Sequence, residues 1–429
     1  MNITRSIPPL PLARRAERGY SLSELVVSMT ASLVLILGVL GVFEMNSRMA
    51  KVQNDLADTQ QSLRAGQHEL VRMGRMAGRG SLGVGVIPAG RAVAVRNNAA
   101  EEEYISPGDD STPGVLEGTD VVTLRGVFNS SLLQIQADVP NTVVFNPSAA
   151  APTDGTIRVR NLAVATLPAG AAVGSAGAVP QDLSPLIQSI TLGRPEALVL
   201  VSATNPDNFA VVELDPANSN ATNPAEVVVG FRVTGGTYTD DNYRHLMPGG
   251  AYPAGFGMPA YLGILEEYRY YVRELRVDAE LMPTLVRART YPNTEVPYAS
   301  QVANWSTELA ENVFDLQAVF GFDQNTDGRV TDVNPPDPTP GDPSPADMDE
   351  LLYDHPNDDD TLPVWASGRL AWLRVTTLSR TDRTDNTYEA PQLLLVEDHD
   401  YAGSELNNDK NRRHRRRIVS THVELRNVF

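Results

Sequence analysis

The sequence predicts an α+β fold in which one long N-terminal helix packs on an antiparallel β-sheet. An uncharged apolar run covers residues 25–43, and an amphipathic pattern with helical spacing follows it to about residue 80. The rest of the 429-residue chain alternates short apolar runs with loops rich in its 32 Gly and 31 Pro, which is typical of β structure. We therefore expect a large β-rich insertion over 81–300, followed by C-terminal strands over 301–429.

The apolar run is long enough to cross a membrane. It holds about 19 residues, close to the ~20 that span a hydrocarbon core of ~30 Å. Four arginines precede it, so the positive-inside rule places the N-terminus in the cytoplasm. A secretory signal would be cleaved after its apolar region. Here the expected cut, between Gly19 and Tyr20, comes before the run, so the span would stay on the mature chain.

The helix should continue beyond the span as an amphipathic segment over residues 44–80. Apolar or small residues recur at spacings of three and four and so share one helical face, with Gly66 in the single gap: Met49, Val52, Leu56, Thr59, Leu63, Leu70, Met73 and Ala77. We expect this face to pack on the sheet. Gly74, Gly78 and Gly80 are expected to mark the end of the helix.

Short strands are expected along the remaining chain. Within the insertion the strand candidates are 92–96, 120–127, 132–137, 142–145, 156–164, 197–203, 209–214, 226–234 and 263–276. Residues 268–273 and 285–289 suggest a hairpin whose tyrosines form aromatic cross-strand pairs, the alternative being a surface for a partner. The Ala- and Gly-rich piece 168–180 suggests a flexible connection, and the Pro- and Asp-rich piece 333–363 an exposed loop.

The composition excludes several classes of function. The net charge of −18 disfavours general nucleic-acid binding, because contacts to phosphate supply most of that affinity. The chain has no Cys, which excludes disulfides, thiol catalysis and Cys-based zinc sites. The sequence lacks the Gly-x-Ser-x-Gly, His-Glu-x-x-His and P-loop motifs, and its six His are scattered. We therefore predict that the protein is not an enzyme.

The N-terminal segment resembles that of type IV pilins and type II secretion pseudopilins. The shared pattern is a basic leader, then Gly19, an aromatic Tyr20, three small or apolar residues and Glu24. An acid at the head of a membrane span is costly and needs a reason. The resemblance implies cleavage after Gly19 by prepilin peptidase, methylation of the new amine on Tyr20, and contact of Glu24 with a neighbouring subunit's N-terminus. The alternative is a plain anchor whose Glu24 lies among the lipid headgroups.

The C-terminal region resembles PilW-type minor pilins of the type IV pilus. The pattern is carried by residues spaced along one strand, Val313, Leu316, Val319, Phe320, Gly321 and Asp323, and by two further strands over 370–380 and 417–427. The resemblance covers 14–79 and 308–429 and is weak over 81–300. It implies a pilin-like fold with a leader over 1–19, a transmembrane helix over 20–43 and its amphipathic continuation over 44–80.

This resemblance implies a structural function. The protein would join other minor pilins and the major pilin in a tip or priming complex that promotes pilus assembly, with a large tip adhesin as a further partner and roles in adhesion and motility. It would first span the inner membrane once, with a periplasmic ectodomain, and then reach the pilus tip. Two alternatives stay open: a type II secretion minor pseudopilin, and a tip adhesin or DNA receptor acting through the 81–300 insertion.

One segment matches the first part of a calcium loop. Oxygen ligands fall at positions one, three and five, and the candidate set is Asp323, Asn325, Asp327, the backbone of Arg329, and Asp332. Gly328 would permit the sharp turn, but Asn334 replaces the bidentate Glu at position twelve. With this ligand set we expect weak affinity, ~10⁻⁴ to 10⁻³ M. The alternative is a solvated turn without a metal.

One basic tract interrupts the acidic chain near its C-terminus. It consists of Arg412, Arg413, Arg415, Arg416 and Arg417, with His414 among them. Such a tract suits DNA or another anion. It lacks interleaved aromatic residues, however, and we expect instead that it pairs with nearby acids such as Glu405 or Asp409, so that nucleic acid is not a partner.

Overall fold

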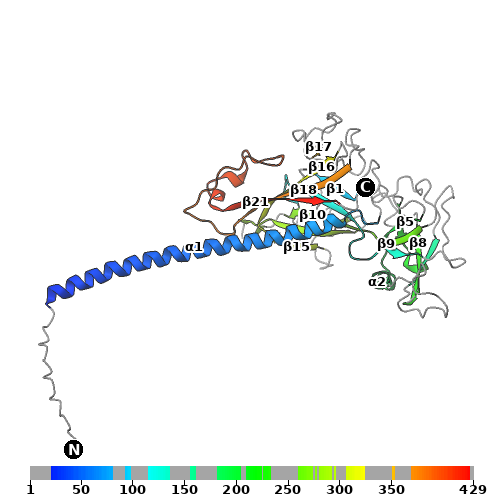
Figure 1. Ribbon diagram of the computed structural model, residues 1–429, viewed down its shortest axis with the longest axis horizontal. Helices are drawn as coiled ribbons and strands as arrows, with labels where there is room; N and C mark the ends of the chain where they lie inside the picture. Colours follow the sequence, from blue (N-terminus) through cyan, green and yellow to red (C-terminus); the bar gives the residue numbers. More distant parts are fainter. Residues whose placement is uncertain are drawn as a thin grey trace, which may run out of the picture. The chain divides into compact units, whose positions relative to one another are not determined.

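Figure 1 shows the computed structural model of the chain. The structure describes residues 21–80, 92–97, 115–135, 155–160, 181–203, 209–224, 226–232, 259–273, 276–277, 280–291, 294–295, 306–323, 350–352 and 369–425. Contacts divide the chain into two units, Met1–Asp55 and Leu56–Phe429. Each unit is described by itself below.

One helix, α1 (Leu22–Met76, 55 residues), carries both the apolar run and its amphipathic continuation. The predicted helix is confirmed, and it ends where Gly78 and Gly80 adopt positive φ angles of 81° and 111°. The Gly78 amide then donates to the Arg125 carbonyl oxygen at 3.0 Å, so the chain is hydrogen-bonded to a strand directly after the helix ends. The expectation for Gly74 was wrong, because this residue lies inside the helix.

A central antiparallel sheet lies against the C-terminal part of the helix. Its strands are β1 (Val93–Arg96), β2 (Val121–Gly126), β10 (Glu266–Arg273), β13 (Thr284–Tyr291), β14 (Thr294–Glu295) and β15 (Ser306–Glu311). They pair in the order β1-β2-β10-β13-β14, and β15 also pairs with β13. The predicted hairpin is confirmed, but the expected aromatic cross-strand pairs were wrong, since Tyr268 lies opposite Arg289 and Tyr270 opposite Arg287.

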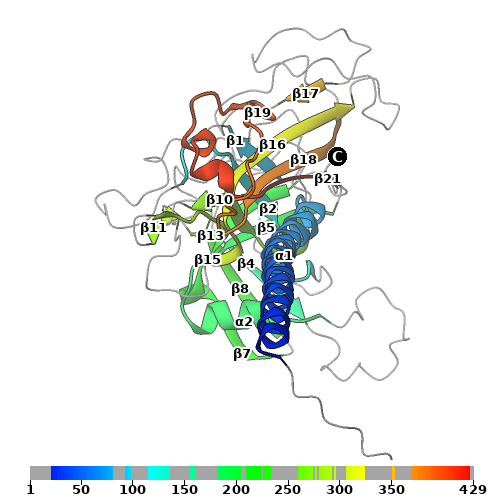
Figure 2. The ribbon, with the colours of Figure 1, turned by 90° about the vertical axis from the view of Figure 1, so that its left-hand side faces the viewer.

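A C-terminal sheet follows in the chain. Its strands are β16 (Val313–Asp323), β17 (Glu350–Leu352), β18 (Arg369–Arg380) and β21 (Arg416–Glu424), in the order β17-β16-β18-β21. Figure 2 shows β16, β18 and β21 side by side. Two small pairs complete the strands, β11 (Arg276–Val277) with β12 (Glu280–Leu281) and β19 (Leu395–Val396) with β20 (His399–Asp400). Short 3₁₀ turns at Glu405–Asn407 and Asn411–Arg413 precede β21.

An insertion sheet is built from the middle of the chain. Its strands are β3 (Leu133–Gln134), β4 (Gly155–Arg160), β5 (Ala197–Ser202), β6 (Phe209–Leu214), β7 (Asn220–Asn223), β8 (Glu226–Arg232) and β9 (Pro259–Ile264). They pair in the order β3-β9-β5-β6-β8-β4, with β7 on β8. A bridge between Ile135 and Val159 joins the two ends of this order, so the sheet closes on itself.

The insertion has its own apolar core. Inward side chains from β4, β5, β6, β8 and β9 meet Leu186 and Ile190 of a short helix, α2 (Ser184–Thr191). A 3₁₀ turn at Pro216–Asn218 lies between β6 and β7. Helix α2 was not expected from the sequence, and the expected strand 142–145 and connection 168–180 lie outside the described residues.

The predicted single strand over 263–276 is divided in the structure. Residues up to Ile264 form β9 of the insertion sheet, and residues from Glu266 form β10 of the central sheet. The buried Leu265 stands between them. The chain therefore passes from one sheet to the other within an apolar run that reads as continuous. Pairing of β13 with β15 also crosses residue 300, so the strand order does not follow the boundary expected there.

The core of the second unit holds the helix against the central and C-terminal sheets. Leu63, Leu70 and Met73 of α1, and Ala77 directly after it, are buried in one cluster with side chains of both sheets. Full burial of a large apolar side chain contributes about 1.5–3 kcal/mol, so this face is a major source of stability. The architecture is α+β, with a long N-terminal helix and a large antiparallel β body.

Candidate functional site

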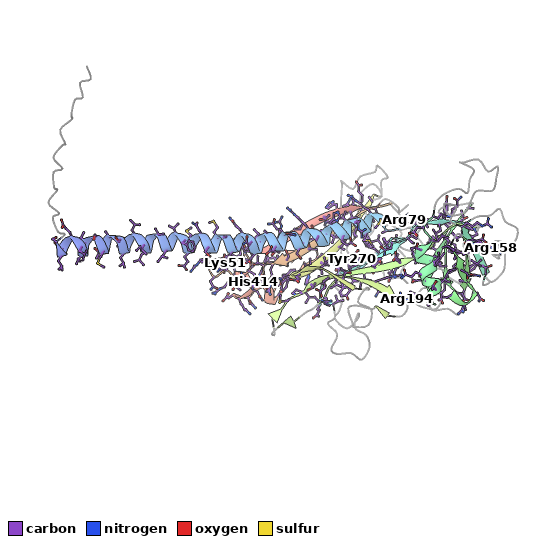
Figure 3. The ribbon with its side chains drawn as sticks, turned by 90° about the horizontal axis from the view of Figure 1, so that it is seen from below. Lys51, Arg79, Arg158, Arg194, Tyr270 and His414 are labelled. Carbon is purple, nitrogen blue, oxygen red and sulfur yellow. The ribbon has the colours of Figure 1, made fainter. Side chains whose placement is uncertain are left out.

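The first half of α1 presents apolar side chains to its surroundings. Leu33, Val34, Leu37 and Phe43 are 60 % or more exposed, and Figure 3 shows the side chains standing out along this part of the helix. By length and composition the helix is apolar enough to cross a membrane, and none of its most apolar part is buried. Such a surface needs lipid or other apolar helices around it.

Glu24 takes part in a reciprocal cap at the start of α1. The Ser21 amide donates to Glu24 Oε2 at 3.0 Å, and the Glu24 amide donates to Ser21 Oγ at 3.2 Å. This arrangement is a capping box, which satisfies two donors that the first helical turn otherwise leaves without partners. The signature Ser-x-x-Glu at residues 21–24 predicts this cap, which neither the intersubunit contact nor the headgroup position expected for Glu24 includes. Gly19 and Tyr20 lie outside the described residues.

An ion-pair cluster attaches α1 to the central sheet. Glu69 accepts from Arg72 Nε at 3.0 Å and also binds the Arg287 guanidinium of β13. Burial acts to raise the pKa of Glu69, but hydrogen bonds and charge from Arg72 and Arg287 outweigh it and hold that pKa below its ordinary value. The Arg287 guanidinium also lies 5.1 Å from the centre of the Tyr268 ring.

Polar contacts outside this cluster reach both sheets. Gln67 Nε2 donates to the Val419 carbonyl oxygen of β21 at 3.2 Å and to Thr377 Oγ1 of β18 at 3.3 Å. The Glu311 amide at the end of β15 donates to Ser62 Oγ at 3.3 Å. The second half of α1 is thus fixed by apolar packing, an ion-pair cluster and hydrogen bonds to three strands.

The basic tract is largely engaged within its own fold. Arg412 Nη1 pairs with Glu389 at 2.7 Å, and Arg415 Nη2 pairs with Asp385 at 2.9 Å. Both partners belong to the segment 385–389, so the expectation of Asp409 did not identify them, and the side chain of Glu405 lies outside the described residues. Hydrogen bonds from Thr387 first, and then from Arg415, hold the pKa of Asp385 below its usual range.

The other members of the tract are held less by acids than by neutral groups. Arg413 Nη1 donates to Asn386 Oδ1 at 3.1 Å, and Arg416 donates to the Leu406 carbonyl oxygen. Burial, together with the charge of Arg412, lowers the pKa of Arg416. Arg417 belongs to β21, where its backbone lies opposite Ser379. The tract therefore does not form a uniform free cationic surface.

The candidate calcium ligands fall mostly outside the described residues. Asp323 is the last residue of β16, and Asn325, Asp327, Arg329 and Asp332 follow it in the part of the chain that the structure does not describe. Among the described residues no group of three or more acidic or His side chains is arranged to hold a metal. Calcium binding by this segment stays a prediction.

Comparison with known proteins identifies the C-terminal region. The family model of PilW, the Type IV Pilus-assembly protein W, matches residues 269–427. The match begins within β10 and takes in β13 and the whole C-terminal sheet, whereas every strand of the insertion sheet lies before it. No curated protein and no solved structure matches the chain.

Proposed function

The chain is a PilW-type protein of the type IV pilus, and from that premise we propose that it is a minor pilin with a pilin-like fold. In this role it assembles with other minor pilins into the tip or priming complex and promotes growth of the filament. The observation that carries the proposal is the PilW match to residues 269–427, in a chain that begins with an exposed apolar helix. The role is one of assembly, without enzymatic chemistry.

Assembly would proceed by packing of the apolar half of α1 among equivalent helices of neighbouring subunits. Residues 25–43 offer no charge to such a bundle, and Glu24 lies at its head. A carboxylate in apolar surroundings is costly unless it is paired. Glu24 Oε2 accepts the Ser21 amide, and Oε1 accepts no hydrogen bond from any described residue. The free oxygen suits the amine that cleavage after Gly19 by prepilin peptidase would create on a neighbour's Tyr20, with or without its methylation.

The location follows from the same helix. One N-terminal apolar helix can span a membrane, and the arginines before it favour a cytoplasmic N-terminus. We place the body on the periplasmic side of the inner membrane before assembly and at the pilus tip afterwards. The major pilin and a large tip adhesin are the further partners that this position implies, with adhesion and motility as the processes served.

Two alternatives differ in what the body contacts. In the first, the protein is a minor pseudopilin of a type II secretion system, whose N-terminal pattern is the same. In the second, the insertion acts as an adhesin or DNA receptor at the tip. The insertion sheet lies outside the PilW match, so the family assigns it no role and it can serve a separate function. The engagement of Arg412 and Arg415 with acids argues against DNA.

Affinity capture of the full-length protein from its own cells, with mass spectrometry of the captured proteins, tests this proposal. We expect other minor pilins and the major pilin. Glu24→Gln should reduce their recovery, whereas Glu44→Gln is the matched control, since Glu44 follows the apolar run and pairs only with Arg48 in the described structure. Secretion pseudopilins in place of pilins would support the first alternative. Capture without any pilin-like partner would contradict both readings.

A further inference from the structure

The turn between β19 and β20 contacts the end of the first strand of the central sheet. Val396 of β19 pairs with His399 of β20, so Glu397 and Asp398 form a two-residue turn. Asn97, the residue after β1, donates from its side-chain amide to Asp398 Oδ2 at 2.7 Å, and Figure 2 shows β19 close to β1. This hydrogen bond joins two parts of the chain that lie 301 positions apart.

The backbone of this turn is strained. Glu397 has a positive φ of 54°, in a region that glycine favours and other residues seldom adopt. Its carboxylate is fixed by β18, since Oε2 accepts from Arg374 Nη2 and Oε1 from Thr376 Oγ1, both at 2.6 Å. Such a conformation persists only where the surrounding contacts hold it. The position of the turn therefore depends on its contacts, including the one between Asn97 and Asp398.

The contact between Asn97 and Asp398 leaves two oxygen atoms without donors. Asn97 Oδ1 and Asp398 Oδ1 are both buried, and neither has a hydrogen-bond partner among the described residues. Each shares its carbon with an atom of the existing hydrogen bond, so both belong to the same two planar groups. Buried polar atoms in folded proteins nearly always have partners. Both oxygens can only accept while Asp398 is ionised, whereas one proton on Asp398 Oδ1 makes it a donor for the Asn97 oxygen.

The surroundings of Asp398 also favour its protonated form. Burial raises the pKa of Asp398 above its ordinary value of 3.8 and outweighs the hydrogen bond from Asn97, which lowers it. The charge of Asp315 on β16 adds to the rise, and His399 of β20 opposes it. The other described charged groups of the neighbouring segments are paired, hydrogen-bonded or exposed: Glu397 with Arg374, Asp120 with the Ala318 amide, and the exposed Glu117 and Asp400.

We propose that Asp398 and Asn97 form a pH-dependent latch, in which a protonated Asp398 exchanges two hydrogen bonds with the Asn97 carboxamide and fastens the β19–β20 hairpin to the end of β1. Asn97 Nδ2 donates to Asp398 Oδ2, and the Asp398 hydroxyl donates to Asn97 Oδ1. After loss of the proton, a buried carboxylate faces the Asn97 carbonyl oxygen, which is costly, and the strained turn separates from β1. Because folding raises the pKa of Asp398, the stabilisation is fully present below 3.8 and is lost as the pH rises through the folded pKa.

Amide hydrogen exchange over residues 395–400 of the full-length protein in detergent, measured at a series of pH values, tests the latch. Asp398→Asn is the reference at each pH, because its carboxamide keeps a donor for Asn97 at every pH. We expect the native turn to be as protected as this variant in acid and to exchange ~5-fold faster than it above the folded pKa, the equivalent of one net hydrogen bond. Asp382→Asn removes an exposed acid of the same segment and should keep the native pH profile.

Infrared spectroscopy detects the proton itself. With ¹³C-labelled aspartate, the difference between the native protein and Asp398→Asn should contain a protonated carboxyl band that persists at pH values above 3.8 and disappears as the pH rises further. Asn97→Ala removes both hydrogen bonds of the latch, so its turn should exchange at least ~5-fold faster than the native turn in acid. The proposal is overturned if Asp398 is ionised at every pH above 3.8, or if exchange in the native protein and in Asp398→Asn keeps the same ratio at every pH.

Discussion

Gly74 of α1 lies against Val423 of the C-terminal sheet, and its replacement by Ala tests how closely the helix packs there. A Cβ atom at this position would lie 2.8 Å from Val423 Cγ1 of β21. Real Cβ atoms do not approach another carbon so closely, and Val423 is fully buried, which leaves it little room to move. Gly74→Ala therefore forces either the helix or the strand to shift.

The magnitude comes from two opposing effects. Within a helix, Ala is favoured over Gly by about 1 kcal/mol. Overpacking of a buried site typically costs ~1–3 kcal/mol. We expect Gly74→Ala to lower the free energy of unfolding by up to ~2 kcal/mol, although helix propensity alone would raise it. Gly38→Ala is the matched control, because nothing lies within 4 Å of a Cβ atom there, and it should not destabilise the body.

Urea unfolding of the full chain in detergent, followed by tryptophan fluorescence, measures this effect, since Trp372 reports from β18. Val423→Ala removes the atom that clashes. The double variant should therefore be more stable than the sum of the two single effects predicts, by about 1 kcal/mol or more. Additive effects, or a Gly74→Ala variant more stable than the native chain by the ~1 kcal/mol that helix propensity alone supplies, would refute the close packing of α1 on β21.

Three further predictions concern the cap, the ion-pair cluster and the metal loop. Ser21→Ala should destabilise the first turn of α1 by ~1 kcal/mol, which would be measured as faster amide hydrogen exchange over residues 22–25, whereas Ser21→Thr should retain most of the protection. Equal exchange in the native protein and both variants would contradict the capping box. Glu69→Gln should destabilise the body by ~1–3 kcal/mol at neutral pH. Folding lowers the pKa of Glu69, so its ionised carboxylate stabilises the native protein at pH values above the ordinary pKa of 4.5, and this stabilisation is lost as the pH falls through the folded pKa. The unfolding curves of the native and Glu69→Gln proteins should therefore converge in acid. A constant difference in stability at all pH values would contradict the role given to the Glu69 carboxylate. Calcium titration should show binding at ~10⁻⁴ to 10⁻³ M that Asp327→Asn weakens, and a heat signal unchanged by that variant would place any calcium elsewhere.

Local patterns predicted the elements whose contacts are near in sequence. The apolar run and the spacing of Leu63, Leu70 and Met73 are sufficient to predict α1 and its buried face. The hairpin of β10 and β13 was also predictable, because its tyrosines and arginines alternate on two adjacent apolar segments. The capping box at Ser21 and Glu24 was predictable as well, because Glu follows Ser at the spacing of three residues that lets each side chain reach the other's backbone amide.

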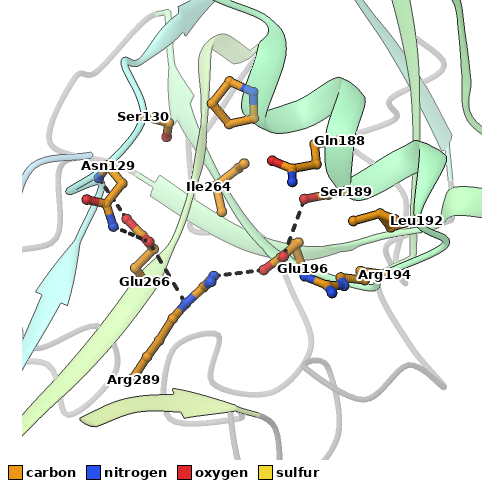
Figure 4. Close-up of a pocket in the computed structure, with 11 residues that line it drawn as sticks. Asn129, Ser130, Gln188, Ser189, Leu192, Arg194, Glu196, Ile264, Glu266 and Arg289 are labelled. Carbon is orange, nitrogen blue, oxygen red and sulfur yellow. Dashed lines mark hydrogen bonds and ion pairs between the residues drawn. The ribbon is translucent and has the colours of Figure 1, made fainter. Parts of the chain in front are cut away.

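Features that depend on distant contacts were not predictable from local patterns. Gly74 looks like a helix stop, and only the position of Val423, far along the chain, makes it a packing residue. The run around Leu265 is apolar on both sides, so nothing local divides it between two sheets. A pocket shown in Figure 4 is lined by Ser130, Glu196 and Arg289, which come from three separate segments of the chain. Each of these residues alone reads as an ordinary polar residue near a strand.

The mass of the N-terminal peptide of this protein, measured in pili sheared from its own cells, tests the central claim most directly. A minor pilin should be present in the sheared filaments, and its chain should begin at Tyr20, with or without a methyl group on the amine. Retention of the leader through Gly19, together with absence of the protein from the filaments and its recovery only in the membrane fraction, would contradict the account.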